Sequence, residues 1–256
     1  MNALREKVER REKLSGAIVS LSDPCLCEIM GNAGFDYIWI DMEHTYMSYK
    51  EVLCHLNAAR STGTPAIVRV PQNDLTATKK VLEMDPDGII FPMVRTPKEA
   101  RELIAMTLYP PLGTRGFGPM RAIRYGADNV NEYTDRKSLE LCRFLQIEHV
   151  DCVESLEEIV SIPYVDGFIF GPNDLSASIG EIGHVFDEHT TALLKKAIRI
   201  LREKGKYIGL ATGSPTPESV KYWTDMGVDM LTAGADWNYV FEKAKASIEI
   251  LRAHQK

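Results

Sequence analysis

Short apolar runs rich in β-branched and aromatic residues recur along this chain, separated by longer amphipathic stretches. That alternation is typical of βα units, in which a buried strand of a parallel sheet is followed by a helix that covers it. The predicted strands are residues 16–21, 37–41, 66–70, 88–94, 143–148, 167–171, 207–212 and 230–234. Eight strands in a chain of 256 residues favour a closed barrel over an open doubly wound sheet.

The stretches between the strands predict a helix after each of them. These helices cover residues 24–33, 49–61, 75–84, 97–108, 153–162, 189–204, 217–226 and 237–254. Asp23, Thr96 and Thr216 each precede a proline, and a capping side chain ahead of a first-turn proline favours a helix start. We therefore predict an α/β protein with a single (β/α)8 TIM barrel domain that spans residues 1–256.

Composition and charge exclude several classes of partner. The formal net charge is −6 and the basic and acidic residues are interspersed, so the chain lacks the positive field that nucleic acid requires. The charged start, residues 5–13, reads as a solvated helix. No apolar run approaches the roughly 18 residues that span a bilayer. The five cysteines suggest neither a disulfide framework nor a zinc site, which favours a reducing cytoplasm.

The longest irregular segment covers residues 109–131 and combines prolines and glycines with Arg115, Arg121 and Arg124. Loops of this length in compact domains are usually functional or mobile. Two interpretations stay open, a lid or substrate loop on the one hand and a structural connector on the other.

Polar residues that end the apolar runs are the candidates for chemistry, because barrel enzymes carry their active sites at the carboxyl ends of the strands. Strand alternation sends Phe144, Gln146 and Glu148 to one side, which we take as the barrel interior. A divalent cation shared with Asp174, after the next strand, is one way to satisfy a carboxylate buried at the mouth. The alternative is an ion pair between Glu148 and Arg69.

His44 follows Asp41 and Glu43 at the end of the second predicted strand. A lone histidine is more often structural, but neighbouring carboxylates favour the protonated imidazole and suggest an acid/base site. A lysine that forms a Schiff base would have to project from a strand end into the mouth, and no predicted strand ends in lysine. This absence favours a metal ion as the electron sink.

Several motifs resemble those of the HpcH/HpaI aldolase family, in the same order and spacing over nearly the whole chain. They are IDMEH at 40–44, RVP at 69–71, YPPLGTRGFG at 109–118, QIE at 146–148, GPNDLSASIG at 171–180 and MGVDMLTAGAD at 226–236. The resemblance implies a class II, metal-dependent aldolase of the phosphoenolpyruvate/pyruvate barrel superfamily. Such an enzyme cleaves or forms the aldol bond of a 4-hydroxy-2-oxo acid and releases pyruvate, or a close analogue, and an aldehyde through a metal-stabilised enolate.

The resemblance also implies a ligand set for the metal and the oxo acid. Glu148 and Asp174 match the metal ligands, and hard oxygen ligands of this kind lead us to expect Mg2+ or Mn2+, with Co2+ as a further candidate. Gln146 matches a residue that lines the pocket. The backbone amides of Gly171, Pro172, Asn173 and Asp174 match the region that receives the pyruvate carboxylate, although proline itself has no N–H to donate.

Three further residues match catalytic positions of the family. Arg69 matches the residue that contacts the oxo-acid oxygen, and His44 matches the acid/base histidine. At Glu83 the family commonly has an aspartate that reaches the histidine of another subunit, so the resemblance implies a homo-oligomer, a hexamer built from dimers or trimers, with composite active sites. The alternative is that Glu83 is one more solvated helix carboxylate. Many relatives also have glycine where this chain has Met42.

Two other functions remain open at this point. A related lyase or mutase of the same superfamily would share the metal and the enolate but act on another bond. A catalytically silent barrel would only bind an oxo acid. The presence of His44, Arg69, Glu148 and Asp174 together argues against the silent barrel.

Overall fold

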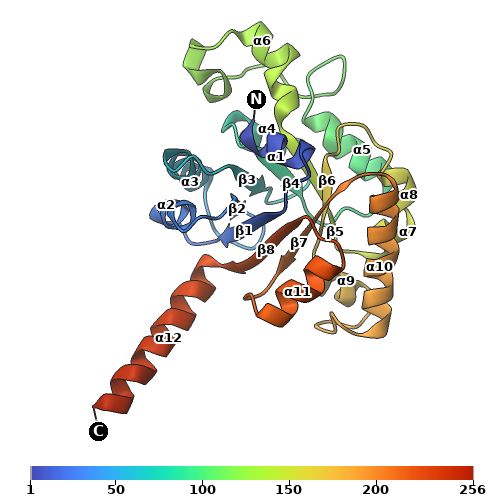
Figure 1. The fold of residues 1–256 in the computed structure, drawn as a ribbon. Coiled ribbons are helices and arrows are strands. Elements are labelled where there is room, and N and C mark those ends of the chain that lie inside the picture. The colour runs from blue at the N-terminus through green and yellow to red at the C-terminus, as the bar shows by residue number, and fades with distance from the viewer. Residues whose placement is uncertain (1, 256) are drawn as a thin grey trace.

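The computed structural model describes residues 2–255, which form a closed barrel of eight strands (Figure 1). Neighbouring strands pair in parallel and in sequence order, and β8 pairs with β1 to close the barrel. The strands are β1 (Leu14–Val19), β2 (Tyr37–Asp41), β3 (Ala66–Arg69), β4 (Gly88–Phe91), β5 (Cys142–Ile147), β6 (Gly167–Phe170), β7 (Tyr207–Thr212) and β8 (Met230–Ala235). The predicted (β/α)8 barrel is confirmed.

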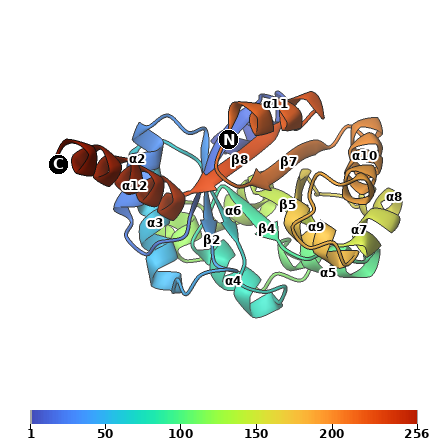
Figure 2. The same ribbon diagram turned by 90° about the horizontal axis from the view of Figure 1, so that it is seen from below.

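Helices surround the barrel (Figure 2). They are α2 (Cys25–Asn32), α3 (Tyr49–Ser61), α4 (Leu75–Glu83), α5 (Pro97–Met106), α7 (Val150–Glu154), α8 (Leu156–Ile159), α9 (Pro172–Ser178), α10 (Glu188–Glu203) and α11 (Pro217–Asp225). The helix expected over residues 153–162 is two short helices, because Ser155 departs from helical backbone geometry at φ −95° and ψ 5°. The short helix α9 was not expected, since proline, asparagine, aspartate and serine favour turns.

Side-chain caps fix two of the three helix starts that proline indicated. Thr96 accepts a hydrogen bond from the Glu99 amide at 3.2 Å, and Thr216 accepts one from the Ser219 amide at 3.2 Å. Asp23 accepts from the Cys25 amide at 3.0 Å, but α2 begins one residue after Pro24. Each cap satisfies a backbone donor that the first turn leaves unpaired.

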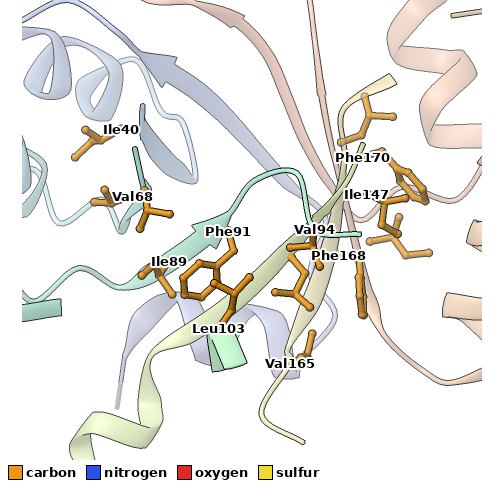
Figure 3. Close-up of a cluster of buried hydrophobic side chains, with 14 of the residues drawn as sticks. Ile40, Val68, Ile89, Phe91, Val94, Leu103, Ile147, Val165, Phe168 and Phe170 are labelled. Carbon is orange, nitrogen blue, oxygen red and sulfur yellow. The ribbon is translucent and has the colours of Figure 1, made fainter. Parts of the chain in front are cut away.

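Alternation along the strands divides the core into two layers. Side chains such as Ile40, Val68 and Phe168 point outward and pack beneath the helices (Figure 3). Phe144 and Ile169 belong to a second cluster, which fills the barrel interior. The interior is therefore packed with side chains, as expected for a barrel of eight strands.

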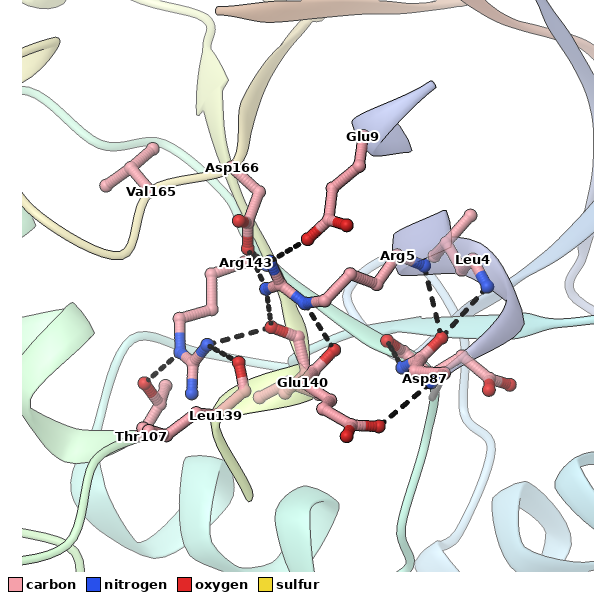
Figure 4. Close-up of polar contacts among 12 residues, drawn as sticks. Leu4, Arg5, Glu9, Asp87, Thr107, Leu139, Glu140, Arg143, Val165 and Asp166 are labelled. Atoms are coloured by element: carbon pink, nitrogen blue, oxygen red, sulfur yellow. Dashed lines mark hydrogen bonds and ion pairs between the residues drawn. The ribbon is translucent and has the colours of Figure 1, made fainter. Parts of the chain in front are cut away.

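The first helix, α1 (Ala3–Glu9), closes the amino end of the barrel. Leu4 is fully buried in the interior cluster, and Arg5 Nη2 donates to Asp166 Oδ2 at 2.9 Å (Figure 4). On the outer side of β5, Arg143 Nε donates to Thr107 Oγ1 at 2.7 Å. The expectation of a solvated helix over residues 5–13 was therefore wrong in extent and in role, because the helix ends at Glu9 and anchors the barrel.

The irregular segment at residues 109–131 lies at the same amino end, because it leads from α5 into β5. It contains a 3-10 helix, η1 (Arg121–Gly126), and leads to α6 (Val130–Asp135) and to a second 3-10 helix, η2 (Lys137–Glu140). Arg121 Nη2 donates to Asn57 Oδ1 at the end of α3 at 2.5 Å. Within one chain this segment therefore does not cover the carboxyl ends of the strands.

The last helix, α12 (Asp236–His254), runs away from the barrel instead of packing on it (Figures 1 and 2). Asp236 is its only buried residue, and apolar side chains such as Trp237, Phe241 and Ile250 are exposed along it. A helix with this much exposed apolar surface is unusual for a monomer. Among residues 2–255 no helix is long and apolar enough to cross a membrane.

Candidate functional site

A cavity of about 590 Å³ opens at the carboxyl ends of the strands. Most of the residues that the sequence singled out line this cavity: His44, Arg69, Gln146, Glu148, Gly171, Pro172, Asn173 and Asp174. No lysine of the described chain lines it, and Lys206 donates to the Val165 carbonyl at the amino end of β7. Side chains from four separate βα units therefore meet at this cavity, as their positions at strand ends predicted.

Arg69 is fixed at the centre of the cavity by an acidic partner on the neighbouring strand. The register of β2 and β3 places Asp41 opposite Arg69. Asp41 accepts from Arg69 Nε at 2.9 Å and from Nη2 at 2.7 Å, and the guanidinium lies 5.1 Å from the Trp39 ring centroid. Burial alone would lower the pKa of Arg69, but the hydrogen bonds and charge of Asp41 outweigh burial and raise it. The guanidinium is therefore a permanent, oriented positive charge.

Glu148 is a buried carboxylate that is linked to Arg69 through hydrogen bonds of Gln146. It is 2 % exposed, and its oxygens accept from Gln146 Nε2 at 2.7 Å and from the Met93 amide at 3.0 Å. Gln146 Oε1 in turn accepts from Arg69 Nη1 at 3.4 Å. Burial raises the pKa of Glu148 to about 7. The predicted alternative of a direct Glu148–Arg69 ion pair is not what forms, because Arg69 pairs with Asp41 and Glu43 instead.

Gly171 makes room for the Glu148 carboxylate. A Cβ atom at this position would lie 2.2 Å from Glu148 Oε1, far inside any contact distance. The chain turns here directly from β6 into α9, whose first turn carries Asp174 as an exposed side chain at the cavity. A glycine is therefore required before this helix, because it leaves space for the Glu148 carboxylate in the turn that places Asp174 at the cavity.

His44 lies on the turn after β2 with an exposed side chain. The turn is held by Asp41, whose Oδ1 accepts from the Glu43 amide at 3.0 Å and whose carbonyl accepts from Thr45 Oγ1 at 2.6 Å. His44 Nε2 lies 3.7 Å from Glu43 Oε2. Met42 is buried in the outer core layer and anchors the same turn.

Glu83 does not join this group within the chain. It ends α4, and its Oε1 accepts from Arg115 Nη2 at 3.0 Å. Glu83 lines a groove between α3 and α4 and not the cavity that holds His44. The proposed Glu83–His44 contact therefore stays a prediction about two chains.

The sequence identified Glu43 only as a neighbour of His44, and it did not identify Met93. Glu43 faces Arg69 Nη1 at 2.8 Å, and burial raises the pKa of Glu43 against the opposing charge of Arg69. The Met93 amide holds Glu148 from the loop after β4. Glu43 could have been found from its place beside a strand-terminal aspartate, whereas a backbone donor such as Met93 leaves no mark in the sequence.

The charge and donors of the cavity suit a hard divalent cation. Asp41, Glu43, Glu148 and Asp174 together outnumber the single arginine, which leaves an excess of negative charge around the cavity. Glu148 and Asp174 offer carboxylate oxygens, the ligands that Mg2+ and Mn2+ prefer. Within residues 2–255 no three His, Cys, Asp or Glu side chains group as a metal site, so substrate and solvent would have to complete the ligand set.

Comparison with known proteins gives a consistent match. The model of the HpcH/HpaI aldolase/citrate lyase family matches residues 14–231. The 2-dehydro-3,6-dideoxy-6-sulfogluconate aldolase of Pseudomonas putida is 31 % identical over 249 residues, covering 97 % of this chain and 96 % of that protein. A hydroxypyruvate/pyruvate aldolase of Deinococcus radiodurans is 33 % identical over 232 residues, covering 90 % of this chain and 82 % of that protein. An HpcH/HpaI aldolase/citrate lyase family protein from Burkholderia cenocepacia has a similar structure, with a TM-score of 0.92, 25 % identity and coverage of 98 % and 100 %.

Proposed function

Because this chain belongs to the HpcH/HpaI aldolase/citrate lyase family, we propose that its cavity breaks and makes the C3–C4 bond of a 4-hydroxy-2-oxo acid. The enzyme is an aldolase, a carbon-carbon lyase, and its products are pyruvate or a close analogue and an aldehyde. The observation that carries the proposal is the fixed guanidinium of Arg69 in a cavity that also holds Glu148 and Asp174 but no lysine of the described chain.

Glu148 and Asp174 are the residues that would hold a divalent metal ion, with Mg2+ or Mn2+ favoured. The buried Glu148 supports this assignment, because burial opposes its ionised form and a bound cation would favour it. When bound, such an ion supplies Lewis-acid stabilisation of negative charge on the oxo-acid oxygen. The amides around Gly171 and Asn173 would receive the carboxylate of the oxo acid.

Arg69 stabilises the charge that develops during the reaction. Asp41 occupies Nε and one N–H of Nη2, and Nη1 faces Glu43 and Gln146. The second N–H of Nη2 would be left for the substrate oxygen. Because the guanidinium is already oriented and partly desolvated, it needs little reorganisation when the enolate forms. Preorganised donors of this kind typically contribute about a hundredfold or more to the rate.

His44 moves the protons. In cleavage it would take the proton of the C4 hydroxyl, the electrons of the C3–C4 bond would form the enolate, and the aldehyde would leave. Protonation at C3 then gives pyruvate, and condensation runs the same steps in reverse. The exposed position of His44 on a turn that Asp41 holds lets it serve the open end of the cavity.

We also propose that the working unit is a homo-oligomer in the cytoplasm, and the family resemblance favours a hexamer. Two features support an assembly: the exposed apolar face of α12, and Glu83 at the amino end of the barrel, where it cannot serve its own His44. A second copy that covers α12 would bury this apolar surface. Glu83 of one copy would then orient His44 of another.

Exchange of the C3 protons of pyruvate tests the chemistry without knowledge of the aldehyde. The protein, stripped with a chelator and reloaded with Mg2+ or Mn2+, is incubated with pyruvate in D2O and the methyl signal is followed by proton NMR. We expect metal-dependent loss of the signal that His44→Ala abolishes. Binding of pyruvate without any exchange would instead indicate a silent oxo-acid-binding barrel.

A further inference from the structure

Arg115 is a buried cation outside the catalytic cavity. It is 2 % exposed, and its guanidinium carbon lies 4.5 Å from the Tyr109 ring centroid and 5.7 Å from that of Tyr133. The two rings meet edge to face with their centroids 6.3 Å apart. A guanidinium stacks on aromatic faces in a way that an ammonium group does not, so the aromatic pair fixes the orientation of this side chain.

The fixed guanidinium holds one carboxylate. Arg115 Nη2 donates to Glu83 Oε1 at 3.0 Å and to the Tyr133 hydroxyl at 3.1 Å. Burial would lower the pKa of Arg115, but the neighbouring Tyr133 and Tyr109 hydroxyls and the hydrogen bond to Glu83 outweigh it and raise the pKa. The cation therefore persists wherever the enzyme works, and Glu83 sits beside a permanent positive charge.

The other oxygen of the same carboxylate lacks a donor. Glu83 Oε2 is buried and accepts no hydrogen bond from residues 2–255. An acceptor left in this state costs roughly 1–3 kcal/mol, or more when it is charged, so this carboxylate is incompletely paired within residues 2–255 of one chain. The Glu83 side chain as a whole is 22 % exposed and lines the groove between α3 and α4, so a donor from another copy can approach the carboxylate from this groove.

We propose that Arg115 is a positioning residue, which holds the Glu83 carboxylate at this groove for His44 of a neighbouring copy. This inference rests on the composite site of the proposed function and adds to it the element that sets the geometry of the acid/base pair. Arg115 would act through Glu83 alone, because it lines neither the catalytic cavity nor any contact with His44. Its loss should therefore change turnover and leave substrate binding intact.

Chemical rescue tests this role. Arg115→Ala removes the guanidinium beside the two tyrosine rings, and added methylguanidinium replaces it. The substitution is made alone and together with Glu83→Gln. Arg136→Ala is the matched control, because Arg136, directly after α6, forms an exposed ion pair with Glu132 at 2.8 Å. The readouts are kcat and KM for pyruvate release, thermal stability, and the assembly state by sedimentation.

We expect Arg115→Ala to lower kcat by roughly 10–100-fold, the usual effect of removing a partner behind a functional group, with KM unchanged. Methylguanidinium should restore kcat in Arg115→Ala but not in the double variant, which should be no slower than Glu83→Gln alone. Unaltered kcat in a folded, assembled Arg115→Ala protein, or a double variant whose losses multiply, would overturn the inference. If Glu83→Gln itself keeps full activity, both the composite site and the role of Arg115 are refuted. The proposal of metal-dependent aldolase chemistry does not depend on that result.

Discussion

A single added methyl group at Gly171 should disable the site that Glu148 forms. In Gly171→Ala the new Cβ would lie 2.2 Å from Glu148 Oε1 and 2.8 Å from its Cγ, whereas ordinary contact begins at 3.4 Å. The carboxylate must move by more than an ångström, so it loses its bonds to Gln146 and the Met93 amide. The backbone at Gly171 has φ −109°, which any residue adopts, so contact and not backbone strain is the cause.

The expected magnitudes follow from this displacement. Loss of the groups that orient a metal ligand typically lowers metal affinity by about 10–100-fold, and overpacking costs about 1–3 kcal/mol of stability. Mn2+ affinity would be measured by calorimetry, and pyruvate release by coupling to a lactate dehydrogenase assay. The matched control is Gly213→Ala, since a Cβ at Gly213 meets nothing within 4 Å. Wild-type Mn2+ affinity in Gly171→Ala would refute the claim that Glu148 is a ligand held in this position.

Three further predictions follow from the site. Arg69→Ala should lower kcat by at least about a hundredfold in a folded protein, and a loss of only a few-fold would make Arg69 a structural partner of Asp41. Mixed after dissociation, inactive His44→Ala and Glu83→Ala proteins should regain activity, and mixed oligomers that stay inactive would exclude the composite site. Burial raises the pKa of Glu148 to about 7, so in metal-free protein its contribution to stability is fully present below the unfolded value near 4.5 and is lost as pH rises toward 7. Urea unfolding in chelator, measured across this pH range, should show a loss of about 1.4 kcal/mol per pKa unit. The free energy of unfolding of Glu148→Gln should depend less on pH, and equal pH dependence in the two proteins would contradict the prediction.

The barrel was predictable because its signals are local. Strands β2 (Tyr37–Asp41) and β7 (Tyr207–Thr212) and helix α3 (Tyr49–Ser61) have the predicted bounds, since short β-branched runs and a capping serine mark them directly. Elements whose formation depends on tertiary contacts were predicted less well. The helix α9 forms from residues of poor helix propensity because the turn after β6 and the packing of buried Leu175 fix it.

The site was predictable only in part, for the same reason. Arg69, Gln146 and Glu148 end apolar runs, and that position alone put them at one end of the barrel. The bidentate pairing of Arg69 with Asp41 depends on the register between two strands, which no local pattern specifies. The direction in which α12 leaves the barrel is likewise a property of the folded chain and not of its amphipathic pattern.

The central claim is that this enzyme releases pyruvate from 4-hydroxy-2-oxo acids with the help of a metal held by Glu148 and Asp174. The direct test is a series of 4-hydroxy-2-oxo acids that vary in length and terminal charge, assayed for pyruvate with chelated and with Mg2+- or Mn2+-loaded protein. We predict that chelation abolishes pyruvate release and that added metal restores it. The Glu148→Gln and Asp174→Asn variants should release no pyruvate. Release that is equally fast in chelator, or full activity and metal content in both variants, would contradict the account.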